Sequence, residues 1–136
     1  MEKSQKSRTI LVADDDRDVN EIAKAFFTTR GHTVLSAFNG ADCVELARKH
    51  SPDIIVLDMK MPGMDGVATA RYLMADSRTS TIPILAVSGL ANMQADALRA
   101  GCEGFVLKPV LPRELLDRIE LVLADRDGTK DRSGFG

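Results

Sequence analysis

Three adjacent aspartates, Asp14, Asp15 and Asp16, follow the apolar segment TILVA at residues 9–13. Like charges this close repel one another by about 1 kcal/mol per pair in water, and by several times more where the dielectric constant is low. A hard divalent cation with oxygen ligands would offset that repulsion, and Mg²⁺ fits best because it keeps positions open for water and phosphate. A simpler alternative is that the aspartates cap a following helix and complement its dipole, a role we expect for Asp16.

Three more polar residues end apolar segments further along the chain: Asp58, Ser88 and Lys108. A lysine suits phosphoryl oxygens by its charge, and a serine hydroxyl suits them by hydrogen bonding. The chain has no G-x-x-x-x-G-K-[ST] loop, so we do not expect a bound nucleotide. The chemistry that remains is transfer of a phosphoryl group onto an aspartate, giving an acyl phosphate.

Short β-prone runs alternate with longer helical patterns and would position these residues. We expect strands at residues 9–13, 32–37, 53–58, 82–88 and 104–108, and helices after each, the last four at 40–50, 67–75, 91–100 and 112–124. In the first helix, Val19, Ile22, Ala23 and Phe26 follow the spacing of a core-facing surface. Strict alternation predicts an α/β fold, a doubly wound parallel sheet with helices on both faces. Ligands of such sheets bind beyond the carboxyl ends of the strands, where all the polar residues above would lie.

Composition limits the class of protein. The 136 residues, 44% of them apolar, with a net charge of -2, predict one ordinary globular domain without a basic surface for nucleic acid or anionic membrane. No apolar run is long enough to span a membrane, and no secretory signal is recognisable, so we expect a cytoplasmic protein. We expect flexible segments at 1–8 and 125–136 around a domain at 9–124. Cys43 and Cys102 are expected to be buried, and His32 and His50 to lie on the surface.

Four segments together resemble the receiver domain of two-component response regulators, over residues 9–124: "ILVADDD", "DIIVLDMKMPGMDG", "PILAVSG" and "GCEGFVLKP". They occur in the order and at the spacing typical of that family. The resemblance implies a flavodoxin-like (βα)5 fold with strand order 2-1-3-4-5, as in single-domain chemotaxis regulators. It also implies a signalling phosphoacceptor that catalyses its own phosphorylation and slow dephosphorylation, and not an enzyme acting on a separate substrate.

By position, the resemblance makes Asp58 the modified phosphoacceptor. Asp14 and Asp15 match the acidic pair, and with Asp58 and the main-chain carbonyl of Lys60 they would bind Mg²⁺. Lys108 matches the lysine that contacts the phosphoryl group, and its bond to the following proline is typically cis in the family. Taken alone, Asp58 could be a turn residue and Lys108 a surface lysine.

Two further residues match the switch of the family. Ser88 takes the position of its Thr or Ser hydroxyl, and Phe105 that of its switch aromatic. The alternatives are a helix cap for Ser88 and a plain core aromatic for Phe105. Three departures stand out: Phe105 lacks the hydroxyl of the common tyrosine, Val110 replaces a frequent aromatic, and Lys60 carries a long cationic side chain two residues after the acceptor.

The resemblance implies a phosphohistidine donor, on a sensor histidine kinase or a histidine phosphotransfer protein, and a downstream protein target. Neither direct nucleic-acid binding nor membrane binding is expected. Residues 90–124, which hold the fourth helix, fifth strand and fifth helix, form the face by which related receivers often dimerise or dock. Two alternatives remain open: a degenerate receiver that only binds partners, and an aspartyl-phosphate hydrolase of the haloacid dehalogenase type, although Asp58-Met59-Lys60 lacks the Asp-x-Asp of that family.

Overall fold

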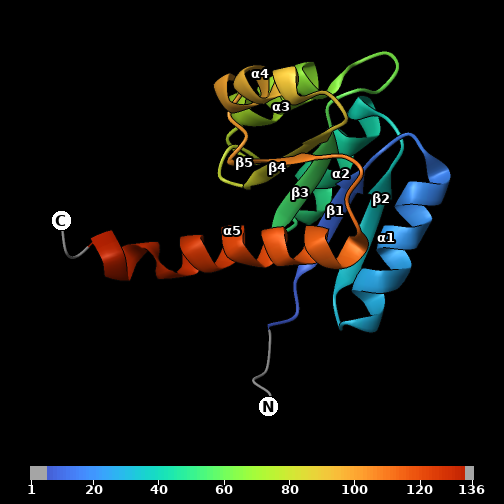
Figure 1. Ribbon diagram of the computed structural model, residues 1–136. Helices are drawn as coiled ribbons and strands as arrows, with labels where there is room; N and C mark the ends of the chain where they lie inside the picture. The colour runs from blue at the N-terminus through green and yellow to red at the C-terminus, as the bar shows by residue number, and fades with distance from the viewer. Residues whose placement is uncertain (1–5, 134–136) are drawn as a thin grey trace.

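The computed structural model describes the backbone of residues 6–133 and the side chains of residues 6–126. Its centre is a five-stranded parallel sheet in the order β2-β1-β3-β4-β5 (Figure 1). The strands are β1 (Thr9–Ala13), β2 (Thr33–Ala37), β3 (Ile54–Asp58), β4 (Ile84–Ser88) and β5 (Gly104–Leu107). The predicted doubly wound sheet and the strand order implied by the family resemblance are both confirmed.

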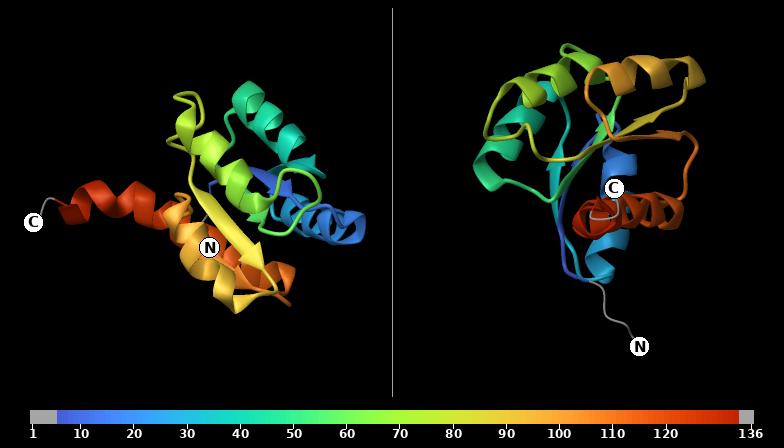
Figure 2. Two further views of the ribbon diagram at one scale, coloured as in Figure 1. Left: turned by 90° about the horizontal axis from the view of Figure 1, so that it is seen from above. Right: turned by 90° about the vertical axis from the view of Figure 1, so that its left-hand side faces the viewer.

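Helices cover both faces of this sheet (Figure 2). They are α1 (Arg17–Thr29), α2 (Gly40–His50), α3 (Gly66–Ala75), α4 (Gln94–Arg99), which a short 3-10 turn η1 (Ala91–Met93) precedes, and α5 (Pro112–Ser133). The apolar side chains of α1 and α5 pack with one set of strand residues, and those of α2, α3 and α4 pack with the other set. No helix in the described part of the chain is long and apolar enough to cross a membrane.

The register of the sheet aligns the carboxyl ends of the strands. Ala13 of β1 lies beside Leu57 of β3, and Asp58 beside Val87 of β4. Ser88 in turn lies beside Leu107 of β5. The residues that end these strands, or directly follow them, therefore share one edge of the sheet, as the alternating pattern predicted.

The first helix buries a face that overlaps the predicted one only in part: Ala23 is buried and Phe26 is partly buried as predicted. Val19 and Ile22 are 40% and 58% exposed, so their assignment to the core was wrong. The buried positions are Asn20, Ala23 and Phe27, which also recur at helical spacing. The apolar residues of α1 fit both faces. The buried face includes the polar Asn20, which in the sequence indicates a solvent-exposed position.

His32 and both cysteines are buried. His32 is buried, because its Nδ1 accepts a hydrogen bond from the Arg8 N–H at 3.0 Å, so its predicted surface position was wrong. Cys43 and Cys102 are buried as expected, and burial raises the pKa of their thiols to about 12 and about 11.

Helix α5 continues through Ser133, past the end expected at residue 124. Flexibility of residues 1–8 and 125–136 stays a prediction, and 1–5 and 134–136 lie outside the described residues.

Gly66 begins α3 directly against the end of β3. A Cβ atom at this position would lie 2.4 Å from the Met59 Cα and 2.5 Å from the Asp58 carbonyl oxygen. Both are backbone atoms, so they cannot rotate away as a side chain would. Glycine at this position therefore permits the close approach that fixes the loop after Asp58.

Replacing Gly66 with alanine should lower the free energy of unfolding by about 1–3 kcal/mol, because the added methyl group must displace backbone. Gly89→Ala is the matched control, since a Cβ at Gly89 meets no atom within 4 Å and the residue has no left-handed φ. It should change stability by less than about 0.5 kcal/mol. Urea denaturation followed by circular dichroism measures both, and equal losses for the two variants would contradict the packing argument.

Candidate functional site

Two carboxylates are buried side by side at the edge of the sheet. Asp14 directly follows β1 and Asp58 ends the adjacent β3, and each residue is 5% exposed. Asp15 is exposed beside them, and one carboxylate oxygen from each of the three lies within 4.8 Å of the others. The structure therefore brings together the carboxylates that the sequence assigned to a metal site, and their geometry suits a small cation with oxygen ligands.

One lysine holds the two buried carboxylates together. The Lys108 Nζ lies 3.3 Å from the Asp14 Oδ2 and 3.2 Å from the Asp58 Oδ2. Lys108 follows β5, so three separate strand ends meet in this arrangement, and its bond to Pro109 is cis as expected. A single ammonium neutralises at most one of the two negative charges.

The pKa values of the site reflect this imbalance. Burial raises the pKa of Asp14, and repulsion by Asp58 adds to the effect, while the Asp16 N–H and Lys108 act in the opposite direction. Burial by itself would lower the pKa of Lys108, but the attraction of Asp14 and Asp58 outweighs it and leaves that pKa above the ordinary value. The site thus favours a charged lysine and disfavours a charged Asp14, as expected where negative charge is in excess.

The backbone fixes the second oxygen of each buried carboxylate. The Asp16 N–H donates to the Asp14 Oδ1 at 2.9 Å, and the Lys60 N–H donates to the Asp58 Oδ1 at 3.1 Å. Asp16 itself caps α1, accepting from the backbone N–H groups of the next turn. The two interpretations of the aspartate run therefore hold for different members: Asp16 is the cap, and Asp14 faces the site.

Asn20 supports the site and was not singled out from the sequence. Its Nδ2 donates to the carbonyl oxygens of Val12, Asp14 and Ala37 at 3.1–3.3 Å, and the residue is 1% exposed. These bonds attach α1 to the ends of β1 and β2 and hold the backbone of Asp14. The available signal was an asparagine in helical register with Ala23 and Phe27.

Ser88 and Phe105 lie on β4 and β5, the pair of strands next to Lys108, and neither belongs to the carboxylate cluster. The Ser88 hydroxyl, although 1% exposed, accepts a hydrogen bond from the Leu90 N–H at 3.0 Å, in the turn that leads to η1. Phe105 is partly buried against the core under α2, α3 and α4. Both remain candidates for a switch. The helix-cap alternative for Ser88 was wrong, since η1 begins after Leu90 and has no side-chain cap.

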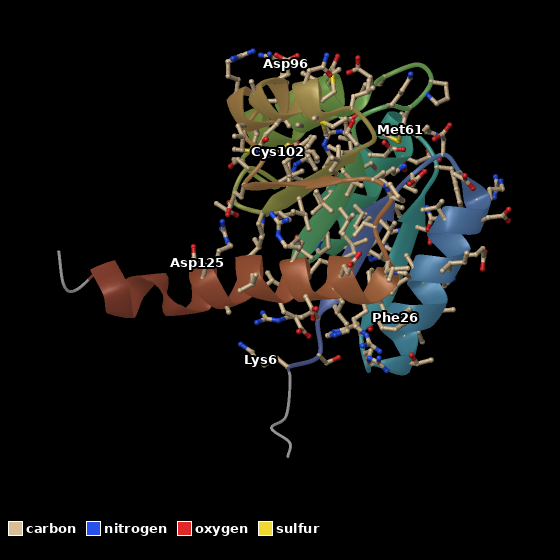
Figure 3. The ribbon with its side chains drawn as sticks, viewed as in Figure 1. Lys6, Phe26, Met61, Asp96, Cys102 and Asp125 are labelled. Atoms are coloured by element: carbon tan, nitrogen blue, oxygen red, sulfur yellow. The ribbon has the colours of Figure 1, made fainter. Side chains whose placement is uncertain are left out.

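The loop after β3 is anchored by its side chains. Met59 and Met61 are buried in the same core, which holds the backbone of Lys60 between them. Figure 3 shows Met61 at the end of the sheet opposite Lys6, on the side where the polar strand ends gather. The contribution of the Lys60 carbonyl to a metal site stays a prediction.

Comparisons with known proteins agree with this geometry. Residues 10–120 match the family model of the response regulator receiver domain. The chain is 37% identical over 118 residues to protein PilH from Pseudomonas aeruginosa, covering 85% of this chain and 97% of that protein. The chain also matches several transcriptional regulators, but it spans only about half of their length. For AfsQ1 from Streptomyces coelicolor, the match covers 57% of that protein.

Solved structures share the fold. A receiver domain protein from Methanospirillum hungatei superposes with a TM-score of 0.84 at 23% identity, over 91% of this chain and 99% of that one. The receiver domain of the Pseudomonas aeruginosa sensor histidine kinase PA1611 superposes with a TM-score of 0.79 at 23% identity, over 88% and 99%, and holds a magnesium ion in its active-site cleft. With an acidic pocket consistent with a phosphoacceptor site, this chain belongs to the response regulator receiver domain family of two-component signalling.

Proposed function

We propose that Asp58 accepts a phosphoryl group from a phosphohistidine on a sensor histidine kinase or histidine phosphotransfer protein. The observation that carries the proposal is the Lys108 ammonium shared by Asp14 and Asp58 at the meeting point of three strand ends. A carboxylate oxygen of Asp58 attacks phosphorus in line, and the bond from phosphorus to the histidine nitrogen breaks. The products are an acyl phosphate on Asp58 and a free histidine.

Lys108 has a defined part in this transfer. Its ammonium already lies 3.2 Å from the Asp58 Oδ2, within reach of oxygens on a phosphoryl group attached there. As Asp58 forms its new bond, the lysine offsets negative charge on the transferring group. Slow return of the phosphoryl group to water would follow from the same arrangement, so the protein modifies itself and does not turn over a separate substrate.

Mg²⁺ is the cation that the site fits. The carboxylates of Asp14, Asp15 and Asp58, with the main-chain carbonyl of Lys60, would hold it, since all are oxygen ligands and the first three lie within 4.8 Å of one another. Burial is the main cause of the raised pKa of Asp14 and repulsion by Asp58 adds to it, and a cation bound between the carboxylates would offset both effects. When bound, the ion supplies charge neutralisation for the phosphoryl oxygens.

The output is proposed to be a change in a protein-binding face. Leu98 of α4, Leu107 of β5 and Leu121 of α5 are 48%, 50% and 64% exposed, so each of these three elements presents an apolar side chain to solvent. A downstream protein, or a second copy of the chain, would cover them. We place the protein in the cytoplasm with its kinase, and assign it no direct binding to nucleic acid or membrane.

Two alternatives differ in a measurable way. A degenerate receiver would bind partners without taking up phosphate, whereas Asp14, Asp15, Asp58 and Lys108 are all present and in contact range. A hydrolase would turn over small phosphoesters, but the position of the second aspartate in the Asp-x-Asp motif holds Lys60, whose N–H supports Asp58. We therefore favour the phosphoacceptor.

Acetyl phosphate with Mg²⁺ should add one phosphoryl group to the protein, and Asp58→Asn should add none. Asparagine keeps the shape of the side chain and removes the nucleophile. Intact-mass measurement reads the adduct directly. Asp53→Asn is the matched control, since Asp53 accepts the Thr9 N–H at the other end of the sheet and should leave phosphorylation unchanged. An adduct that persists in Asp58→Asn would exclude this acceptor.

Asp14→Asn should make the metal-free fold more stable near neutral pH. A carboxyl whose pKa is higher in the folded chain than in the unfolded chain favours folding while protonated, and loses this advantage as the pH rises through the folded pKa. Asparagine does not titrate, so the variant should gain on the parent as the pH rises from acid to neutral, by about 1 kcal/mol, the scale of one like-charge pair.

Urea denaturation in a chelator across this pH range measures the effect of Asp14→Asn. Added Mg²⁺ should stabilise the parent more than the variant, since the variant lacks a charged ligand. A variant that is less stable at every pH, and that gains as much from Mg²⁺ as the parent does, would remove Asp14 from the metal site.

Ser88→Ala should still accept phosphate while losing most of the change on the face formed by α4, β5 and α5. To donate to a phosphoryl oxygen, the Ser88 O–H must turn away from the Leu90 carbonyl oxygen, 3.5 Å from it. Because the same hydroxyl oxygen accepts from the Leu90 N–H, its movement toward Asp58 would move the turn before η1. Amide NMR with and without beryllofluoride, a phosphoryl mimic, follows the residues around Phe105. Equal perturbations in Ser88→Ala and the parent would show that the hydroxyl does not operate the switch.

A further inference from the structure

A deep cleft of about 580 Å³ opens beside the carboxylates, between the first half of α1 and the start of α5. Its floor is the sheet itself, because Val12, Val56 and Val87 line it although they are only 3–5% exposed. The volume lies within the range of about 300–1,000 Å³ that is typical of small-molecule sites. The cleft is therefore large enough to hold a small molecule.

The walls of the cleft are formed by apolar side chains, some of them exposed to solvent. Val19 and Ile22 of α1 line it on one side and are 40% and 58% exposed, while Val110 and Leu115 line it on the other. These are the α1 positions that the helical pattern assigned to the core and the structure leaves in solvent. A compact apolar body in the cleft would remove both from water.

The mouth of the cleft carries excess negative charge. Its charged lining residues are Asp14, Asp16, Asp58 and Lys108, three carboxylates and one ammonium, which leaves a net charge of -2. Lys108 is shared between Asp14 and Asp58, so it neutralises neither completely. Without a bound metal ion, an anionic ligand would be repelled at this place, and a neutral ligand would leave the negative charge uncompensated.

We infer that this cleft binds small amphipathic amines, with the apolar body between α1 and α5 and the ammonium at the carboxylates of Asp14 and Asp16. The ligand class goes beyond the proposed phosphoacceptor function, and only its consequence rests on that function. An ammonium at Asp14 occupies a ligand of the proposed Mg²⁺ site, so amine and metal exclude each other. A bound amine would then keep Asp58 unphosphorylated, and the cleft would be a regulatory site.

Three probes of one shape test the ligand class: phenethylamine, neutral 2-phenylethanol and anionic 3-phenylpropionate. Each is titrated into the metal-free parent protein and followed by amide NMR. Phenethylamine should shift the amides of Ile22, Ala23 and Val110 and bind at least about tenfold more tightly than the alcohol. The acid should bind more weakly still, and Mg²⁺ should displace the amine. Equal binding of the amine and the alcohol, or shifts confined to other parts of the protein, would overturn the proposal.

Two variants with controls test the position. Val110→Phe should fill the cleft and weaken amine binding by about tenfold, whereas Leu121→Phe, on an exposed part of α5 outside the cleft, should not. Asp16→Asn removes one charge and keeps the helix cap, so it should weaken the amine and leave the alcohol unchanged. Thermal unfolding confirms that each variant is folded. Unchanged amine binding in Val110→Phe would overturn the assignment.

The two proposals fail separately. If the protein takes no phosphate from acetyl phosphate but binds the amine as described, the phosphoacceptor function falls and the ligand site stands. If Val110→Phe blocks phosphoryl transfer from a protein phosphodonor but leaves amine binding unchanged, the cleft is a docking site for that protein and the proposed amine site is wrong.

Discussion

Two buried carboxylates that share one lysine are the constraint on which the rest of this structure depends. Asp14 and Asp58 lie on adjacent strands, and Lys108 reaches both from a third. Burial alone disfavours a charged Asp14, and Asp58 adds repulsion. The fold therefore holds an electrostatic arrangement that is unfavourable by itself, and the packing of the strands compensates for it. The low dielectric constant of a buried site would also strengthen the attraction between these carboxylates and a bound cation.

The protein tolerates this repulsion because its carboxylates are attached to rigid elements. The central strands β1, β3 and β4 are apolar and almost completely buried, and α1 is tied to the end of β1 through Asn20. One oxygen of each buried carboxylate is fixed by a backbone N–H, so the carboxylates cannot rotate apart without losing a hydrogen bond. The repulsion is therefore relieved by a positive charge beside the carboxylates or by a proton on Asp14, and not by movement of the carboxylates.

Much of this arrangement could be predicted from the sequence, because it follows from the position of polar residues at the ends of apolar runs. Asp58, Ser88 and Lys108 each end a β-prone segment, and parallel strands bring such ends to one edge. The strand order followed from the family resemblance. Hydrophobic periodicity predicts where strands occur, but it contains no information about which strands are neighbours in the sheet.

The failures have a common physical origin. The buried face of α1 includes Asn20, whose burial is stabilised by three backbone acceptors from β1, β2 and the residue after β1. His32 is buried for the same reason, with a backbone donor from Arg8. A hydropathy pattern treats both side chains as solvent-exposed, because it contains no information about hydrogen-bond partners that are distant in the sequence. For the same reason, the pattern predicts Val19 and Ile22 in the core, whereas in the structure they line the cleft between α1 and α5.

Lys108 also links the carboxylates to the residues proposed to transmit the signal. Its backbone N–H donates to the Ser88 carbonyl oxygen at 2.7 Å, which joins the ends of β4 and β5. The Ser88 hydroxyl holds the next turn through Leu90, and Phe105 lies on the same short strand that ends beside Lys108. A phosphoryl group on Asp58 would bring more negative charge close to the Lys108 ammonium and draw it away from Asp14. The Lys108 side chain and the N–H that donates to the Ser88 carbonyl oxygen belong to one residue, so that redistribution of charge would act on the pair of strands that carries both switch candidates.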